Sequence, residues 1–224
     1  FAAIAAIAYA LALGETHHAT RTPFNLRAIT STYSSLTTDR RFLIPAATVS
    51  LIIGGLFSMF SAAPRVLIEE LHFTPIELGL FFAGTVIIVF AAGMLATRLA
   101  PRFGLERPVQ AGLILTVTGS VAVLLVARMH GTFLPFLGSI SVFLLGMGII
   151  NPLGTAQTLS PFGEKAGAAS ALLGFWQMMG AAIGVWLVTT IANDAMMGLG
   201  LVLTLSSLLA LILYRLRIRA SSLA

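Results

Sequence analysis

The chain has 224 residues, of which 58% are hydrophobic and only 9% are charged, and its formal net charge is +5. A soluble domain carries about 25% charged residues, so this composition excludes a water-facing surface and indicates a membrane protein. Only helices or closed barrels satisfy their backbone hydrogen bonds in a bilayer. The apolar runs are about 20 residues long and do not alternate, which favours helices. The lack of cysteine excludes disulfides and thiol chemistry.

The chain begins with an apolar stretch, 1–13, that is too short to span a bilayer and lacks the basic start of a signal peptide. We interpret it as the end of a truncated transmembrane helix, so that the chain would be a fragment of a longer polypeptide. A long polar loop, 14–41, follows. Apolar residues recur in this loop at i, i+3, i+7 and i+10, namely Leu26, Ile29, Tyr33 and Leu36. This spacing predicts a short amphipathic helix on the membrane surface; the alternative is a flexible linker with a chance period.

Six complete apolar spans follow the loop, with short connections between them. They lie at roughly 42–63, 75–97, 108–127, 133–159, 166–192 and 195–214. The sequence therefore predicts an all-α integral membrane protein, with a bundle of six transmembrane helices over 42–214 and a short tail over 215–224.

The basic residues are distributed unevenly between the two sides that such a bundle creates. Of the 13 Lys and Arg residues, all except Arg65 and Arg128 lie on the side that holds the long loop and the C-terminal tail. The positive-inside rule places that side in the cytoplasm. Because the basic residues are spread over four segments, the charge reflects topology, and we expect no binding of nucleic acid.

Two helix ends carry local signals. Thr74, Pro75 and Glu77 form a capping box with proline at the first helical position. Glu77 is also the acid nearest to membrane depth, so a proton-coupling role is the alternative, but the spacing favours the cap. Tyr214, followed by Arg215, predicts an anchor at the membrane interface.

Ionisable residues within the membrane would be the first candidates for function. All eight acids and four histidines lie in loops or at the ends of the predicted helices. The sequence also shows no metal-binding or hydrolase motif. We therefore expect neither an enzyme nor a cofactor or metal site.

Three amides remain inside the apolar spans around 161–165: Asn151, Gln157 and Gln177. A helical rise of about 1.5 Å per residue places Asn151 and Gln177 roughly 15–17 Å from this turn, near the bilayer midplane. An unpaired amide facing lipid there costs several kcal/mol, so each must face another helix or a wet cavity. For Gln177, interhelical hydrogen bonding and lining of a substrate path are equally good interpretations. For Asn151, the neighbouring Pro152 favours a packing role.

Small residues share one helix face with Gln177: Ser170, Gly174, Ala181 and Gly184. Gly180 and Gly184 also form a small-xxx-small pair, which is typical of close helix packing. Trp176 lies beside this face and would either stack on an aromatic ligand or pack against a neighbour.

Three stretches carry a family pattern. They are Leu13-Gly-Glu-Thr16, Gly93-Met-Leu-Ala-Thr-Arg-Leu-Ala-Pro-Arg-Phe-Gly104, and PFGEKAGAASALLGFWQ over 161–177. The second resembles the weaker copy of the Gly-x-x-x-Asp-Arg-x-Gly-Arg-Arg loop motif of the major facilitator superfamily. Here Thr97 replaces the Asp, so the gating contact of that Asp is not carried over. The first and third resemble the end of the sixth helix and the turn before the eleventh helix in drug antiporters, the third most closely in the Bcr/CflA subfamily of drug:proton antiporters.

The resemblance implies the C-terminal half of a twelve-helix carrier, with 1–13 as the end of the sixth helix and 14–41 as the cytoplasmic loop between the halves. It implies proton-coupled export of drugs or amphiphilic molecules by alternating access in the inner (plasma) membrane. The partners would be a small-molecule substrate, protons, the bilayer and the missing N-terminal half, which usually carries the coupling carboxylate. We expect a monomer with a cytoplasmic C-terminus.

The resemblance also assigns candidate residues. Gln177, Asn151, Trp176 and Ser170 would line the substrate cavity, and Gly93, Arg98 and Arg102 would belong to a gating loop. The alternatives are a carrier for a metabolite such as a sugar or organic acid, and a membrane enzyme or structural protein. A metabolite site should offer more charge or amide groups than these spans contain, so drug export is preferred.

Overall fold

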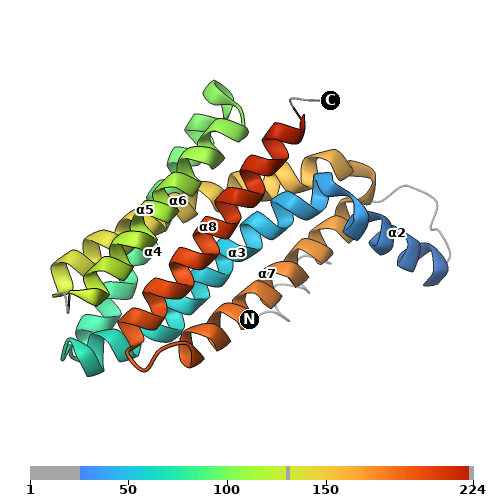
Figure 1. Ribbon diagram of the computed structural model, residues 1–224. Helices are drawn as coiled ribbons and strands as arrows, with labels where there is room; N and C mark the ends of the chain where they lie inside the picture. Colours follow the sequence, from blue (N-terminus) through green and yellow to red (C-terminus); the bar gives the residue numbers. More distant parts are fainter. Residues whose placement is uncertain (1–25, 130–131, 222–224) are drawn as a thin grey trace, which may run out of the picture. The chain divides into compact units, whose positions relative to one another are not determined.

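The computed structural model describes residues 26–129 and 132–221 (Figure 1). The predicted helix end at 1–13, the loop before residue 26 and the family pattern at 13–16 lie outside the described residues. The chain divides into two compact units, 1–31 and 32–224, and the second contains all of the apolar helices. The description below concerns that second unit.

Six long helices form the unit, and each one covers a span predicted from the sequence. They are α3 (Arg40–Pro64), α4 (Pro75–Phe103), α5 (Glu106–Arg128), α6 (Phe133–Leu159), α7 (Ala166–Thr190) and α8 (Ala195–Ser221). A π-helical turn, η1 (Arg65–Glu70), extends α3, and a 3-10 turn, η2 (Ser160–Lys165), joins α6 to α7. Within the described residues, five continuous helical segments are long and apolar enough to cross a membrane, and one of them, 133–190, contains both α6 and α7. The predicted all-α membrane fold is confirmed.

The loop helix predicted from the apolar period is also present, as α2 (Leu26–Thr38). Its last turns pack against other helices, and its position on the membrane surface stays a prediction. Leu36 is only 1% exposed and packs with Phe42 of α3 and Leu172 of α7, and Tyr33 lies partly buried beside it. Helix contacts, rather than lipid, cover this part of the apolar face.

The bundle consists of two sets of three helices, and in each set one helix packs against two helices from the other half of the chain. α3 packs against α7 and α8, while α6 packs against α4 and α5, and α3 and α6 meet at the centre. α5 and α8 also pack against each other, which closes one side of the bundle (Figure 1). The contacts of α3 with α7 and α8 correspond to those of α6 with α4 and α5, and α3 and α6 run in opposite directions. This is the pattern expected of an inverted repeat, a common plan in membrane transporters.

Glycines permit a close helix crossing between α3 and α7. A Cβ atom added to Gly54 would lie 2.6 Å from the carbonyl oxygen of Gly180, and one added to Gly184 would lie 2.5 Å from that of Gly54. Only glycine permits this approach, because any side chain would collide with the facing backbone. The predicted packing role of Gly180 and Gly184 is therefore confirmed.

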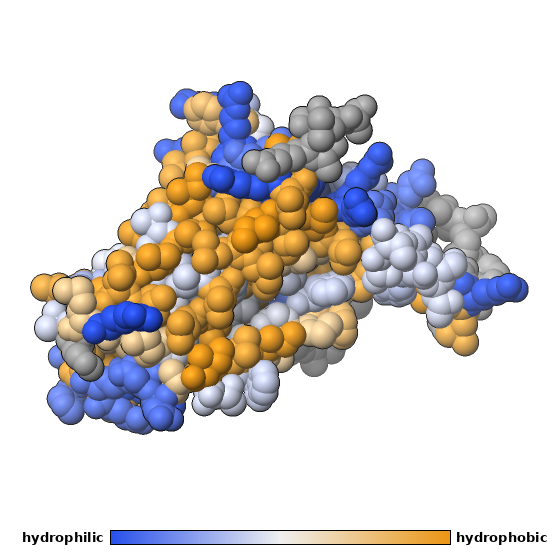
Figure 2. All heavy atoms as spheres, in the orientation of Figure 1, coloured by the Kyte–Doolittle hydropathy of each residue, from blue (hydrophilic) through white to orange (hydrophobic). Residues whose placement is uncertain are grey.

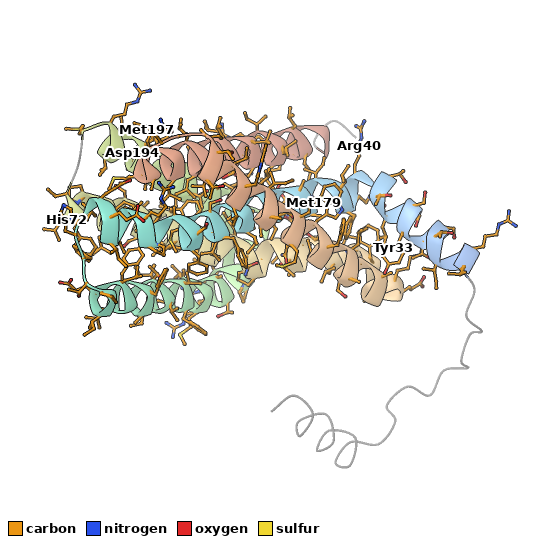
Figure 3. All side chains as sticks on the ribbon, turned by 90° about the horizontal axis from the view of Figure 1, so that it is seen from below. Tyr33, Arg40, His72, Met179, Asp194 and Met197 are labelled. Atoms are coloured by element: carbon orange, nitrogen blue, oxygen red, sulfur yellow. The ribbon has the colours of Figure 1, made fainter. Side chains whose placement is uncertain are left out.

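The ends of the bundle are polar and its sides are apolar (Figure 2). Arg40 lies at the end where α3 begins, which we call the basic end, and His72 and Asp194 lie at the opposite end (Figure 3). The alternating helices bring the turns 104–105 and 160–165 to the basic end as well. This is the separation of basic residues that the sequence predicts for a membrane bundle.

Candidate functional site

A pocket between α4 and α6 contains two of the predicted site residues. It has a volume of about 380 Å³ and is lined by Val89, Phe90, Gly93, Met94, Thr97, Gly148, Asn151 and Pro152. Asn151, predicted for substrate binding, and Gly93, predicted for a gating loop, therefore lie in the same pocket. The pocket combines one amide with apolar and aromatic side chains.

Local sequence explains how the pocket forms. Gly148 lets α4 approach α6, because a Cβ atom added there would lie 2.6 Å from the Cβ atom of Ala92. Pro152 has no backbone N–H, so the Gly148 carbonyl lacks the donor that a helix normally supplies from four residues ahead. One backbone carbonyl of α6 therefore lacks its usual helical donor close to Asn151 in the sequence.

A smaller pocket of about 100 Å³ adjoins the first one and shares Val89 and Phe90 with it. Its other lining residues are Leu56, Phe60, Thr85, Val86 and Leu144. The ring of Phe60 packs edge-to-face on that of Phe82, with 5.6 Å between their centroids. We call the two pockets together the α4 groove. No charged side chain is among the residues that line it.

The three intramembrane amides have different environments. Gln157 is 6% exposed, and its Oε1 accepts a hydrogen bond of 3.2 Å from the hydroxyl of Tyr214, which links α6 to α8. Asn151 and Gln177 are half-buried, and within the described ranges 26–129 and 132–221 neither side chain has a hydrogen-bond partner. Gln157 is therefore the packing amide, whereas the other two retain unused donors and acceptors.

Tyr214 corrects the sequence prediction. It was expected to anchor the last helix at the interface, but it is 1% exposed and donates its hydrogen bond to Gln157 inside the bundle. A buried hydroxyl needs such a partner, and α6 supplies it.

The predicted residues on α7 do not reach the α4 groove. Ser170 is exposed and donates to the carbonyl oxygen of its own Gly167 at 3.0 Å. Trp176 packs beside Leu36 and Phe42, and its indole nitrogen is buried without a partner among the described residues. Adjacent residues of a helix point about 100° apart, so Trp176 and Gln177 face different neighbours. The structure does not gather the four predicted cavity residues into one pocket.

The predicted gating loop is the end of α4. Arg98 and Arg102 are exposed, lie one helical turn apart and reach the basic end, whereas Gly93 lies inside the pocket. The helix ends at Gly104, whose φ of 73° is a conformation that favours glycine. The motif therefore runs from the α4 groove to the polar surface.

Glu77 is a capping residue. Its Oε2 accepts hydrogen bonds of 2.8 Å from both the backbone nitrogen and the hydroxyl of Thr74, and its own N–H donates to the Thr74 hydroxyl at 3.4 Å. The predicted capping box is confirmed. The Glu77 carboxylate is already hydrogen-bonded to Thr74 at the start of its own helix.

Sequence reasoning missed most of the apolar lining of the groove, including Phe60, Phe90 and Met94. These residues stand in spans that are apolar on every side, so no periodic signal marks the face that lines a pocket. Only the packing of α4 on α6 distinguishes them.

Comparison with known proteins places the chain in a family. The family model of the Major Facilitator Superfamily matches residues 1–185. Multidrug resistance protein MdtL of Salmonella typhi is 29% identical over 192 residues, which cover 82% of this chain and 45% of that protein. The uncharacterized MFS-type transporter YdgK of Bacillus subtilis (strain 168) is 23% identical over 159 residues, covering 71% of this chain and 40% of YdgK.

The chain spans less than half the length of these curated relatives. The membrane-length helices, the apolar sides of the bundle and the family match over most of the chain all indicate the same kind of protein. The chain belongs to the Major Facilitator Superfamily, a family of multi-pass membrane transporters rather than of enzymes.

Proposed function

We propose that this chain is the C-terminal six-helix half of a secondary transporter that exports drugs or amphiphilic small molecules in exchange for protons. The observation that carries the proposal is the α4 groove. It is apolar and aromatic, it has no charged lining residue, and it offers the unpaired amide of Asn151. Pockets that are mostly apolar with few polar groups suit drug-like ligands.

The lack of charged side chains in the lining of the groove argues against the main alternative substrates. An organic acid would need a cation to replace its hydration, because burying an unpaired charge is costly. A sugar presents many hydroxyl groups, and the groove would leave most of them without partners. An uncharged or amphiphilic molecule can place its apolar part against Phe60 and Phe90 and use Asn151 for orientation.

The relatives support the same class, since MdtL carries the name multidrug resistance protein. The proton-coupling acid would belong to the N-terminal half. The acid on α4, Glu77, is engaged in its cap and has no role in this scheme. We further propose that the basic end faces the cytoplasm, that the protein resides in the inner membrane and that it acts as a monomer.

The test is efflux of ethidium from cells that express the full-length polypeptide, with and without a protonophore. Efflux that stops when the protonophore is added supports the proposal. Absence of efflux for a panel of drugs, with the protein present in the membrane, would overturn drug export and favour a metabolite carrier.

A paired substitution on α4 locates the binding surface. Phe90→Ala removes a ring from the groove and should weaken apparent affinity for aromatic drugs by roughly tenfold, the loss expected for one well-placed aromatic contact. Phe103→Ala removes the same ring from the same helix, at a position that is also exposed but lies outside the groove. Equal effects of the two substitutions would contradict binding in the groove.

A further inference from the structure

The inner half of α7, by which we mean Ala166–Trp176 at the basic end, packs in a hydrophobic cluster separate from the main core of the bundle. Its buried members are Leu36, Phe42, Ala46, Ala169, Leu172 and Leu173. In the main core, α7 contributes Val188, near the opposite end of the helix, as its fully buried residue. The two halves of α7 are thus held by different contacts.

The separate cluster is built by the joint between α2 and α3, which we call the elbow. α2 ends at Thr38 and α3 begins at Arg40, so Asp39 alone connects them. Asp39 caps α3, since its carboxylate accepts a hydrogen bond of 2.8 Å from the backbone nitrogen of Arg41. Its own N–H donates to the Leu36 carbonyl oxygen at 3.3 Å. A connection this short, with both sides hydrogen-bonded, fixes the angle between the two helices.

The elbow contacts the turn before α7 as well as α7 itself. The rings of Phe42 and Phe162 meet edge-to-face, with 5.8 Å between their centroids. Lys165 donates a hydrogen bond of 3.4 Å from its Nζ to the hydroxyl of Ser35. The elbow therefore contacts both η2 and the first turns of α7, close to where the chain enters the bundle.

Burial along α7 shows what the elbow covers. Leu172 and Met179 lie seven residues apart and therefore on the same side of the helix. Met179 is 36% exposed, but Leu172 is 9% exposed. Leu172 belongs to the cluster that Leu36 of α2 and Phe42 of α3 share, whereas Met179 lies outside this cluster; Figure 3 labels Met179 and Tyr33, which packs against the cluster.

The rest of α7 has few other restraints. Beyond the elbow it packs mainly on α3, through the glycine crossing, and only weakly on α6 and α8. Gly180 and Gly184 bring the backbones of α7 and α3 into direct contact at this crossing, so it holds the outer half of α7 independently of the elbow. Gln177 lies between this crossing and the elbow.

We propose that the elbow is a clamp that holds the inner half of α7 against α3, and that opening the clamp exposes this half of α7 while its outer half stays in place. The inference concerns the mechanics of the six helices and does not depend on the proposed substrate.

Site-specific labelling tests the clamp in the full-length polypeptide, in a background free of other cysteines. This chain has none of its own. A cysteine at Leu172 reports on the inner half of α7, and a cysteine at Val188 reports on the outer half. The rate of reaction with a membrane-permeant maleimide is measured for each.

Leu36→Ala should raise the labelling rate at Leu172→Cys by roughly tenfold, because local opening becomes easier, and should leave Val188→Cys unchanged. Thr37→Ala, next along the same helix at an exposed position, is the matched control and should change neither rate. An equal rise at both cysteines, or no rise at Leu172→Cys, overturns the clamp.

A milder variant covers the case in which Leu36→Ala prevents folding. Lys165→Ala removes only the hydrogen bond to Ser35 and should raise labelling at Leu172→Cys by a smaller factor in the same direction. Amide hydrogen exchange gives an independent measure, with faster exchange expected over 166–176 and unchanged exchange over 180–190. Uniform acceleration along α7 contradicts the proposal.

Discussion

Gly180→Ala tests whether α3 and α7 approach each other as closely as the structure shows. The new Cβ atom would lie 2.5 Å from the carbonyl oxygen of Ser50, where an ordinary contact requires at least 3.4 Å. The helices must therefore separate by roughly 0.9 Å at this point, and overpacking of this kind costs about 1–3 kcal/mol. The carbonyl belongs to the backbone of α3, so no side chain can move aside.

A second glycine on α7 provides the control. A Cβ atom added to Gly174 meets no atom within 4 Å. Gly174→Ala should therefore be neutral or stabilising by up to about 1 kcal/mol, since alanine restricts the unfolded chain more than glycine does. Both substitutions add one methyl group to the same helix, so their difference isolates the crossing.

The assay is thermal unfolding of the purified full-length protein in mild detergent. Gly180→Ala should lower the melting temperature, by on the order of 5 °C, while Gly174→Ala should leave it unchanged or raise it. Equal melting temperatures for the two variants would refute the close approach of α3 and α7.

Three further predictions concern single polar groups. Tyr214→Phe should lower the free energy of unfolding by about 1 kcal/mol, and in combination with Gln157→Leu the two losses should be less than additive; full additivity would mean that the two side chains do not interact. Glu77→Gln should leave protonophore-sensitive efflux intact, because glutamine also completes a capping box, and loss of efflux would show a coupling role. Gln177→Leu should leave the amount of protein in the membrane unchanged but alter the substrate profile; equal loss of every substrate together with poor expression would indicate packing.

Much of the fold follows from hydropathy and local signals. A bilayer admits few structures, so an apolar run of about 20 residues is enough to predict a helix. The span predicted at 133–159 coincides with α6, and the capping box at Thr74 marks the start of α4. The pair Gly180 and Gly184 also indicated a close crossing, because small residues in this spacing permit backbone contact.

The candidate site was much less predictable. Asn151, Gln157 and Gln177 are equivalent in the sequence as amides in apolar spans. In the bundle, Gln157 meets Tyr214, Asn151 lines the α4 groove, and Gln177 lies at neither place. The hydrogen-bond partner of Gln157 and the α4 residues that share a pocket with Asn151 come from other helices, which no spacing within one span can reveal.

The sequence by itself determined that the chain crosses a membrane, where its helices lie along the chain, and which end of the bundle is basic, although α4 and α8 run past their predicted ends at 97 and 214. These properties depend on the solvent and on residues close together in the chain. The tertiary structure decided which faces of the helices meet, which amide is paired, and that Leu36 covers α7 instead of lying on lipid. The physical reason is that the spans are apolar on all sides, so their sequence periods cannot distinguish a face that meets lipid from one that meets another helix.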